Sequence, residues 1–407
     1  MWLWVQRIAI PHQQAESATL GIPRGNLSDL YPRWLGAREL LLHHRDPYGA
    51  DLTREIQTGY YGRPLDPARP NDPKDQQAFA YPLYVVFVLA PTVGLPFAAV
   101  QKAFLVFLIL VTSGSILWWL RVLGWRVSAG TKFVWILLTL GCFPAIQGFK
   151  LQQLTLLVAA LIALAMYAIA RRHLVLAGIL LAVASIKPQL VALLIAWLCI
   201  WVAGNWRERR ALVLSLGASM ALLIGGAEIL LPGWIGEFRS ASAAYYRYTG
   251  GGRSVLDVLL SPAWGKTLAV VLAWTVLVFL WRLRRAGETT AEFHWAQCLV
   301  LAATLTMIPM FAPYNQLLLL PALMMIARRA GLLWQENRFS RFFLAVTAAA
   351  VFWPWMAAAA LALALLFLTA AAVQRAWTLP LFTSLAIPVM VLAVLLARRK
   401  ILCSAEC

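Results

Sequence analysis

Residues 180–194 read LLAVASIKPQLVALL, and Lys187 is the single charge in the apolar run that extends from Leu174 to Val202. Burying an ammonium group in hydrocarbon costs about 2.5–3.5 kcal/mol even on the lenient insertion scale, so some interaction has to compensate for it. Pro188 cannot continue the hydrogen-bond ladder of a helix, and broken helices at membrane depth are tolerated only beside a protein cavity. We therefore expect two half-helices, each about 14 residues or roughly 21 Å long, that meet at Lys187.

The composition of the whole chain predicts an all-α polytopic membrane protein. Of its 407 residues, 61% are hydrophobic and 13% are charged, whereas a globular domain carries roughly 25% charged residues. The five cysteines give no disulfide framework, because Cys142, Cys199 and Cys298 stand in apolar runs where a small buried thiol is usual. Cys403 and Cys407 form a lone C-x-x-x-C pair, which is weak support for a metal. We expect no metal site and no cofactor.

The formal net charge of +18 comes from arginines and lysines clustered in short loops between apolar runs. This distribution is the positive-inside pattern, which sets the orientation of a membrane protein and does not indicate nucleic-acid binding. The clusters are Arg121, Arg126 and Lys132; Arg171 and Arg172; Arg207, Arg209 and Arg210; Arg282, Arg284 and Arg285; Arg328 and Arg329.

The basic clusters show how the apolar spans are oriented. Together with the two half-helices that meet at Lys187, the apolar spans predict a bundle of about 10–12 transmembrane or re-entrant helices over residues 98–400. Because the run 174–202 begins and ends at basic loops, it should be a re-entrant hairpin with Lys187 at its tip, facing the outer side. Arg398, Arg399 and Lys400 fit badly, since the threading puts them outside. The candidate spans are 98–120, 132–147, 151–170, 211–231, 264–281, 294–312, 314–327, 342–355, 357–373 and 378–397.

Residues 1–97 are predicted to form an outer-face segment, together with an outer loop at 232–263. The stretch 79–97 is apolar but contains Pro82, Pro91 and Pro96, which is typical of an interfacial or re-entrant helix. The start, MWLWVQRIAI, is too short to span a bilayer and lacks the features of a signal peptide. We therefore expect that a first transmembrane helix is missing from this sequence.

Residues 26–49, NLSDLYPRWLGARELLLHHRDPYG, predict an amphipathic helix on the outer side. Leu30, Trp34, Ala37 and Leu41 recur at helical spacing, directly after Asp29. Either Asp29 or the neighbouring serine at position 28 can serve as the helix N-cap. Alternatively, the Asp29 carboxylate acts as a general base at the membrane surface. The adjacent histidines 43 and 44 cannot easily converge on one metal ion, since a closed site needs three or four converging ligands.

The order of motifs resembles glycosyltransferase family 87, the polyprenol-phosphate-mannose-dependent mannosyltransferase-like proteins with the C-type membrane glycosyltransferase fold. The resemblance covers residues 26 to about 330, and it rests on the order and spacing of motifs that are individually weak. Members often show a tryptophan and a histidine late in the chain, where this sequence reads APYNQLLLLPAL, so the donor sugar stays open. The matching motifs are Asp29 to Ala37, Asp46-Pro47-Tyr48, Tyr81-Pro82-Leu83, Gln152-Gln153-Leu154-Thr155, and Ala177-Gly178 through Lys187-Pro188.

The resemblance implies a membrane glycosyltransferase that moves a hexose, with mannose as the family's typical sugar, from a polyprenyl-phosphate carrier to a glycan or glycolipid acceptor. Inversion at the anomeric carbon is expected, with Asp29 as the base. Lys187 would pair with the donor phosphate, and Arg239, Arg247 and Arg253 would close over it; the simpler alternative for Lys187 is a lysine that snorkels to the interface. Further substrate-binding candidates are Asp46, Tyr81, Gln153, Thr155, Gln189, Asn315 and Gln316.

The implied location is a bacterial cytoplasmic membrane, with membrane lipids around the bundle and the active site facing the periplasm or exterior. Two other classes remain open. Broken helices with a charge at depth also mark the substrate sites of transporters and flippases, although no second K-P hairpin appears in the later half. A non-catalytic scaffold would need neither Asp29 nor Lys187. No glycine-rich phosphate loop follows a strand pattern, which argues against a nucleotide-sugar donor.

Overall fold

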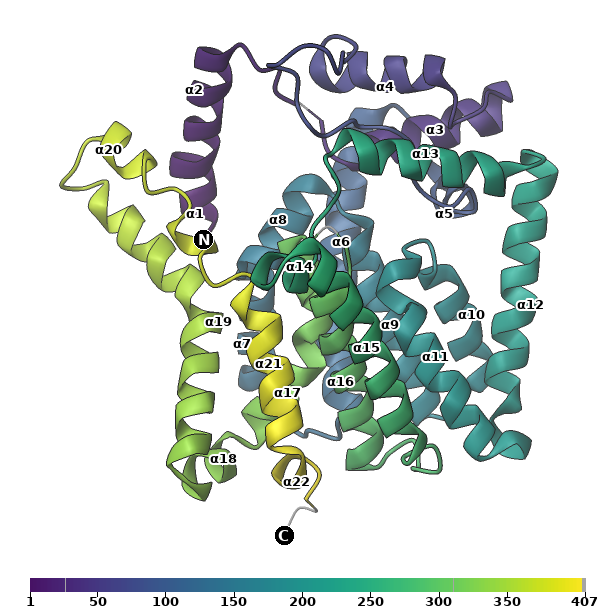
Figure 1. Cartoon of the computed structure of the whole chain (residues 1–407), viewed down its shortest axis with the longest axis vertical. Helices are drawn as coiled ribbons and strands as arrows, with labels where there is room; N and C mark the ends of the chain where they lie inside the picture. Colours follow the sequence, from purple (N-terminus) through teal and green to yellow (C-terminus); the bar gives the residue numbers. More distant parts are fainter. Residues whose placement is uncertain (26, 310, 405–407) are drawn as a thin grey trace.

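The computed structural model describes residues 1–25, 27–309 and 311–404, and within these it consists of helices and loops without strands (Figure 1). Five segments are long and apolar enough to cross a membrane, and two bent helix pairs raise that number to as many as seven. The all-α polytopic class is thereby confirmed. The five segments are α6 (Phe97–Val122), α12 (Trp206–Leu230), α15 (Pro262–Trp281), α19 (Arg338–Ala364) and Ala370–Ala397, which ends in α21 (Ala386–Ala397).

The predicted hairpin is present as α10 (Leu174–Ala184) and α11 (Pro188–Gly204), separated only by residues 185–187. Both of its open ends lie at the loop between α15 and α16 (Ala291–Met307). Arg172, just before α10, forms an ion pair with Glu288 at 2.6 Å, and Trp201, near the end of α11, donates to the carbonyl of Ala286 at 2.8 Å. The run therefore enters and leaves at one end of the bundle, as predicted.

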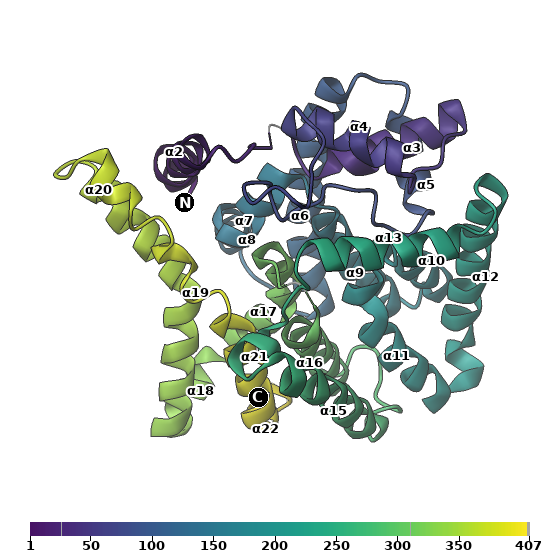
Figure 2. The same cartoon turned by 45° about the horizontal axis from the view of Figure 1, so that its top comes forward.

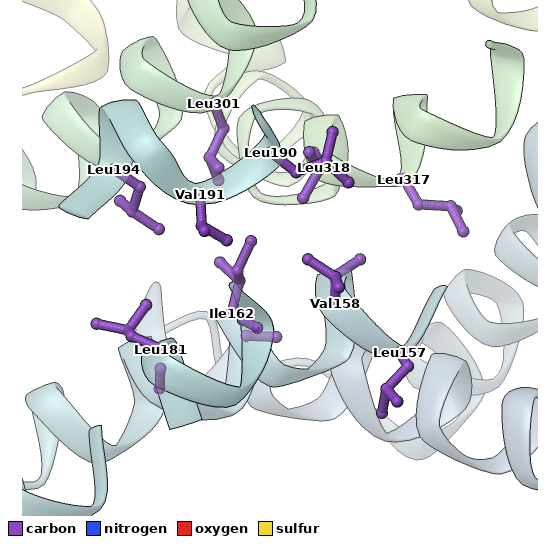
Figure 3. Close-up of a cluster of buried hydrophobic side chains, with 14 of the residues drawn as sticks. Leu157, Val158, Ile162, Leu181, Leu190, Val191, Leu194, Leu301, Leu317 and Leu318 are labelled. Carbon is purple, nitrogen blue, oxygen red and sulfur yellow. The ribbon is translucent and has the colours of Figure 1, made fainter. Parts of the chain in front are cut away.

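The core lies where the hairpin packs against α9 (Leu154–Ala170), α16 and the 3₁₀ helix η3 (Pro313–Leu319) (Figure 3). Val158 and Ile162 of α9 face Val191 of α11 and Leu318 of η3, and all four side chains are almost fully buried. Such a dry apolar contact fixes the short helices that are not long enough to span a bilayer alone.

Of the predicted spans, 132–147 is broken within its length, whereas 314–327 is helical and bends only beyond its end. The span 132–147 is divided into α7 (Ala129–Gly141) and α8 (Phe143–Leu151), which meet at an angle of 58°. The break lies at Cys142, which has extended backbone, and Pro144 stands in the first turn of α8, where its missing N–H costs nothing. The span 314–327 begins as η3 and becomes α17 (Leu320–Arg328), which then bends by 60° into α18 (Ala330–Glu336).

The separate spans 342–355 and 357–373 are also wrong, because α19 runs unbroken through Pro354. A proline inside a helix leaves the carbonyl four residues earlier without its usual donor. Here the hydroxyl of Thr383 donates to that carbonyl, on Ala350, at 2.8 Å. Because α19 is one helix and not two, the next span, Ala370–Ala397, runs back toward the end of the bundle at which α19 begins. Arg398 consequently pairs with Glu336 at 3.3 Å, at the same end as the other basic clusters.

We call this end, where the loops carry the arginine clusters, the basic end. The opposite end, here the α3 end, carries α3 (Leu30–His43), α4 (Ala50–Tyr61) and α13 (Trp234–Tyr248), which lie across it in both views (Figures 1 and 2). The predicted outer loop 232–263 is largely helical, since α14 (Val255–Leu259) follows α13. Within 79–97 only α5 (Val85–Leu89) and η2 (Ala90–Thr92) are helical before α6 begins.

The first residues also form a helix, in three consecutive parts: α1 (Trp2–Trp4), η1 (Val5–Ala9) and α2 (Ile10–Leu20). Trp4 and Ile8 are buried in a small apolar cluster with Phe143 of α8 and Leu361 of α19. This segment therefore packs against the bundle. Asn26 and Cys407, which belong to two of the sequence motifs, lie outside the described residues.

Candidate active site

Two contacts hold Asp29 at the start of α3 against the turn between α8 and α9. The N–H of Asp29 donates to the carbonyl of Leu151 at 3.0 Å, and the hydroxyl of Ser28 donates to the side-chain oxygen of Gln152. Asp29 occupies the N-cap position, but neither its side chain nor that of Ser28 caps the helix. The carboxylate is thus left to interact with other groups, which separates it from an ordinary helix cap.

The Asp29 carboxylate accepts hydrogen bonds from three side chains. Gln153 donates its Nε2 to Oδ2, while Tyr60 and Gln77 approach Oδ1 at 3.4 and 3.5 Å. Burial raises the pKa of Asp29 above its ordinary value; Arg33 and Lys187 lower it and Asp75 raises it further, with a net rise. A carboxylate of raised pKa is a stronger proton acceptor than a surface aspartate, which suits a general base.

Lys187, at the tip of the hairpin, is only 7% exposed. Its ammonium group donates to Gln153 Oε1 at 2.8 Å and to Thr155 Oγ1 at 2.7 Å, and Thr155 in turn donates to Asn315 Oδ1 at 3.1 Å. The rings of Tyr81 and Tyr314 have their centroids 5.6 and 5.3 Å from Nζ. Two hydrogen bonds and two aromatic faces compensate for the desolvation of this charge.

Gln153 links the two charged groups through one amide. Its Nε2 donates to Asp29, and its Oε1 accepts from Lys187. We call the resulting series, Asp29–Gln153–Lys187–Thr155–Asn315, the polar chain. The residue before Gln153, Gln152, has a left-handed backbone (φ 50°) that ends α8 and lets α9 begin at Leu154. This turn is what brings the amide between a base and a cation.

The other sequence candidates lie in several places. Tyr81 borders the polar chain, whereas Asp46 accepts from the N–H of Tyr48 at 2.9 Å and forms the expected turn. Tyr48 donates its hydroxyl to the carbonyl of Tyr81 at 2.7 Å, so that turn supports the site indirectly. Gln316 faces away from the polar chain and donates to the carbonyl of Ser384 at 2.6 Å. The exposed candidates, outside the polar chain, are Gln189, Arg239, Arg247 and Arg253.

Sequence reasoning missed a second carboxylate at this site. Asp75 stands in an irregular polar segment with no motif to mark it, yet it accepts from Gln77 at 2.7 Å and from the hydroxyl of Tyr245 at 2.9 Å. Tyr245 lies on α13, so this contact ties the helix of the former loop 232–263 to the site. Arg33 was missed as well: its guanidinium donates to the carbonyl of Asp29 and lies 4.7 Å from the centroid of the Tyr81 ring.

An apolar cavity of about 500 Å³ adjoins the site, between α7, α8, η3, α17 and α19. Its walls are almost entirely hydrocarbon, including Trp135, Leu323 and Ala348. Gln316 lines it, while the preceding residue, Asn315, belongs to the polar chain. The polar chain and the apolar cavity therefore lie on two sides of η3, with Asn315 in the first and Gln316 in the wall of the second.

Comparison with known families gives one match, to glycosyltransferase family 87, over residues 79–313. This region is more than half of the chain. The chain belongs to glycosyltransferase family 87. The family-87 region contains Tyr81, Gln153 and Lys187, whereas Asp29 and Asn315 lie on either side of it. Comparisons with curated proteins and with solved structures found no match.

Family membership, together with the apolar helices, makes this chain a membrane glycosyltransferase. It favours the transferase over the transporter that the broken hairpin alone left open. The place of Asp29 in the site rests on its contacts with the family-87 region, through Gln153, since Asp29 itself precedes the matched residues.

Proposed function

We propose that this family-87 enzyme transfers a hexose from a polyprenyl-phosphate carrier to a hydroxyl of a glycan or glycolipid. The observation that carries the proposal is the Gln153 amide, which is hydrogen-bonded at once to a carboxylate and to an ammonium group. A glycosyl transfer needs both kinds of group close together. The carboxylate accepts a proton from the acceptor, and the cation compensates the charge of the departing phosphate.

The proposed reaction is a direct displacement. The acceptor hydroxyl loses its proton to Asp29, and its oxygen bonds to the anomeric carbon. The bond from that carbon to the phosphate oxygen breaks, and the bonding pair leaves with the polyprenyl phosphate. Lys187 holds this phosphate through a charge-assisted hydrogen bond. Attack and departure on opposite faces of the sugar give inversion.

The apolar cavity beside η3 supports a lipid-linked donor. The switch from Asn315 in the polar chain to Gln316 in the cavity wall gives a short path from a phosphate at Lys187 to a hydrocarbon chamber. An isoprenoid tail gains free energy from such a chamber in proportion to the apolar area it buries. A nucleotide leaving group would gain nothing there.

We further propose that the basic end faces the cytoplasm and the α3 end faces the periplasm or exterior, in a bacterial cytoplasmic membrane. The correction to α19 strengthens this orientation, because it places Arg398 beside Glu336 with the other clusters. Single cysteines, in a background without the native ones, test it: Lys74→Cys at the exposed α3 end should react with an impermeant thiol reagent in intact cells. Arg210→Cys should not react.

The reaction is tested with purified enzyme in lipid nanodiscs and radiolabelled polyprenyl-phosphate hexoses, mannose first. The expected result is release of polyprenyl phosphate and transfer of label to an added glycan or glycolipid acceptor, with no turnover of nucleotide sugars. Consumption of a nucleotide sugar alone would overturn the donor assignment. Passage of an intact lipid-linked sugar across a vesicle membrane, without cleavage, would favour the flippase.

A further inference from the structure

A polar cavity lies at the basic end of the bundle, and none of its lining residues belongs to the polar chain. It has a volume of about 490 Å³, in the range of ligand pockets. Five segments converge on it: the ends of α6, α9 and α17, the start of α16, and the last described residues after α22 (Arg399–Leu402). We call it the basic pocket. Among its described lining residues, the charged side chains are Arg121, Arg171, Arg328 and Arg329.

One ring nitrogen of a buried histidine in the basic pocket has no hydrogen-bond partner among the described residues. His294, in the second turn of α16, is 7% exposed and lines the cavity, and its Nε2 is unpaired among the described residues. Buried ring nitrogens of histidine are normally paired, because leaving one unpaired costs about 1–3 kcal/mol. A ligand in the pocket would supply the missing partner.

The simplest alternative is that these arginines only set topology and complement helix ends. Arg328 does donate to the carbonyl of Leu123, and Arg329 donates to the carbonyl of Ser404 at 2.7 Å. However, topology requires only that the charges stand in short loops, and does not require four of them to border one cavity. Arg121 and Arg171 bring two positive charges to the same cavity, and an anion bound there would offset their repulsion.

We propose that the basic pocket binds the phosphate-bearing headgroup of an anionic membrane lipid. Guanidinium groups match phosphate oxygens in pairs, and basic pockets between helices on the cytoplasmic side are suited to anionic headgroups. Part of the wall is apolar, with Val122, Leu123, Met325 and Leu402, which gives an acyl chain a place to lie. A free phosphate would use the arginines but not this wall.

The test measures binding of dioleoyl phosphatidylglycerol, dioleoyl phosphatidylcholine and inorganic phosphate to the full-length protein, by native mass spectrometry and by thermal unfolding in detergent. We expect the anionic lipid to be retained and to raise the unfolding temperature, and the zwitterionic lipid and phosphate to do neither. Arg121→Gln and Arg171→Gln should each weaken anionic-lipid binding about tenfold, as expected for a lost hydrogen bond between charged groups.

Three control variants separate the basic pocket from general attraction. Arg285→Gln removes an arginine of the same end that does not line the pocket, and should leave binding unchanged. Ala170→Phe keeps every charge but fills part of the cavity, and should weaken binding. Lys187→Met alters only the polar chain and should leave phosphatidylglycerol binding unchanged.

Each result decides between the alternatives. If Arg285→Gln weakens binding as much as Arg171→Gln does, or if Ala170→Phe binds normally, the lipid is attracted by surface charge and the proposal is wrong. If inorganic phosphate competes as strongly as the lipid binds, the arginines form a phosphate site but the lipid assignment fails. Because Arg171 is exposed and contributes little packing, its substitution should not prevent folding.

Discussion

Two cations are buried to the same extent at opposite ends of this molecule. Arg209, 6% exposed at the basic end, donates to the backbone carbonyls of Trp201, Arg284 and Ala286 at 2.8–2.9 Å, and it stacks on the Trp201 ring at 4.0 Å. Lys187 is 7% exposed at the α3 end, and among the described residues its ammonium group donates only to side chains, those of Gln153 and Thr155.

The difference between the two sites lies in what the cation holds. Arg209 joins a carbonyl near the end of α11, on Trp201, to two carbonyls of the loop between α15 and α16, on Arg284 and Ala286, so it is part of the structure. The partners of Lys187 are rotatable amide and hydroxyl groups, which can turn toward another ligand. A buried cation paired with movable side chains, in a chain that leads to a carboxylate, is suited to receive an anion.

The largest expected effect is at Asp29, the first residue of the polar chain. Asp29→Asn keeps the size of the side chain and an acceptor for Gln153, but removes the proposed base. Transfer should slow by about 10²–10⁴, the usual contribution of general base catalysis. Single-turnover transfer measures the rate, and thermal unfolding checks the fold.

Asp46→Asn is the matched control, since Asp46 accepts a turn hydrogen bond from Tyr48 that asparagine can also accept. It should retain near-normal transfer. Rapid transfer by Asp29→Asn would remove Asp29 from the chemistry, and collapse of Asp46→Asn alone would move the base there.

The paired substitutions Lys187→Met and Arg209→Met test the comparison directly. Lys187→Met removes an ammonium that is costly to bury, so stability should hold while donor affinity falls by roughly 1.5–3 kcal/mol, or about 10–100-fold. Arg209→Met removes the donor of the Trp201 and Arg284 carbonyls, at about 1–3 kcal/mol each, while Ala286 keeps the indole N–H of Trp201, so stability should fall by about 2 kcal/mol or more. The molecules that remain folded should bind donor normally.

Donor binding to nanodisc-held enzyme and denaturation curves, taken on the same preparations, check both variants. The proposed difference between Lys187 and Arg209 would be wrong if Lys187→Met unfolds as readily as Arg209→Met and its folded fraction binds the donor at wild-type affinity. Lys187 would then be a structural lysine, and the phosphate role would be wrong.

The pH dependence of transfer should report the raised pKa of Asp29, which burial and Asp75 produce. Because the base must be ionised, the rate should fall as the pH drops through this raised value, at a higher pH than an ordinary aspartate, near 3.9, would give. The stability of the fold should change with pH in the opposite direction to the rate. Ionising Asp29 disfavours the fold, so stability is lost as the pH rises through the raised pKa of Asp29.

Asp75→Asn sharpens this measurement. Removing the neighbouring negative charge should lower the pKa of Asp29, so the acid limb, the fall of kcat/KM on the acidic side, should move to lower pH. Asp66→Asn alters a carboxylate of the same loop outside the site and should leave this limb unchanged. An acid limb unaffected by Asp75→Asn would show that another group controls the rate.

The hairpin could be predicted because its signal is local. A lysine and a proline inside an apolar run have few arrangements open to them in a membrane, and basic loops on both sides fix the direction. The failure at α19 is equally instructive. The sequence was divided into spans 342–355 and 357–373, but α19 continues through Pro354, and the donor that replaces its missing N–H comes from Thr383, which no local pattern indicates.

The site could be predicted only in part, because several of its contacts come from residues that are distant in the sequence. Lys187 was named from its isolation in an apolar run and Asp29 from its place before an amphipathic helix and the family resemblance, but nothing in the sequence indicated that Gln153 joins them. Asp75 and Gln77 reach Asp29 from an irregular segment with no periodicity. Arg33 was accessible in principle, since it stands four residues after Asp29, at the spacing of neighbours on one helix face.

The smallest expected effects belong to Arg239, Arg247 and Arg253, which are exposed in and just after α13. Their proposed role is to attract and cover the donor phosphate, and an exposed cation near an anionic surface contributes about 1 kcal/mol. Each substitution by glutamine should therefore weaken donor binding no more than about fivefold, and the difference from wild type should disappear in high salt, which screens exposed charges. Lys187→Met should keep its defect at every salt concentration, because the polar chain is buried. Donor titrations at low and high ionic strength compare the four variants. A loss at Arg239 that is as large as that at Lys187, and that persists in salt, would place α13 over the phosphate as a second binding element.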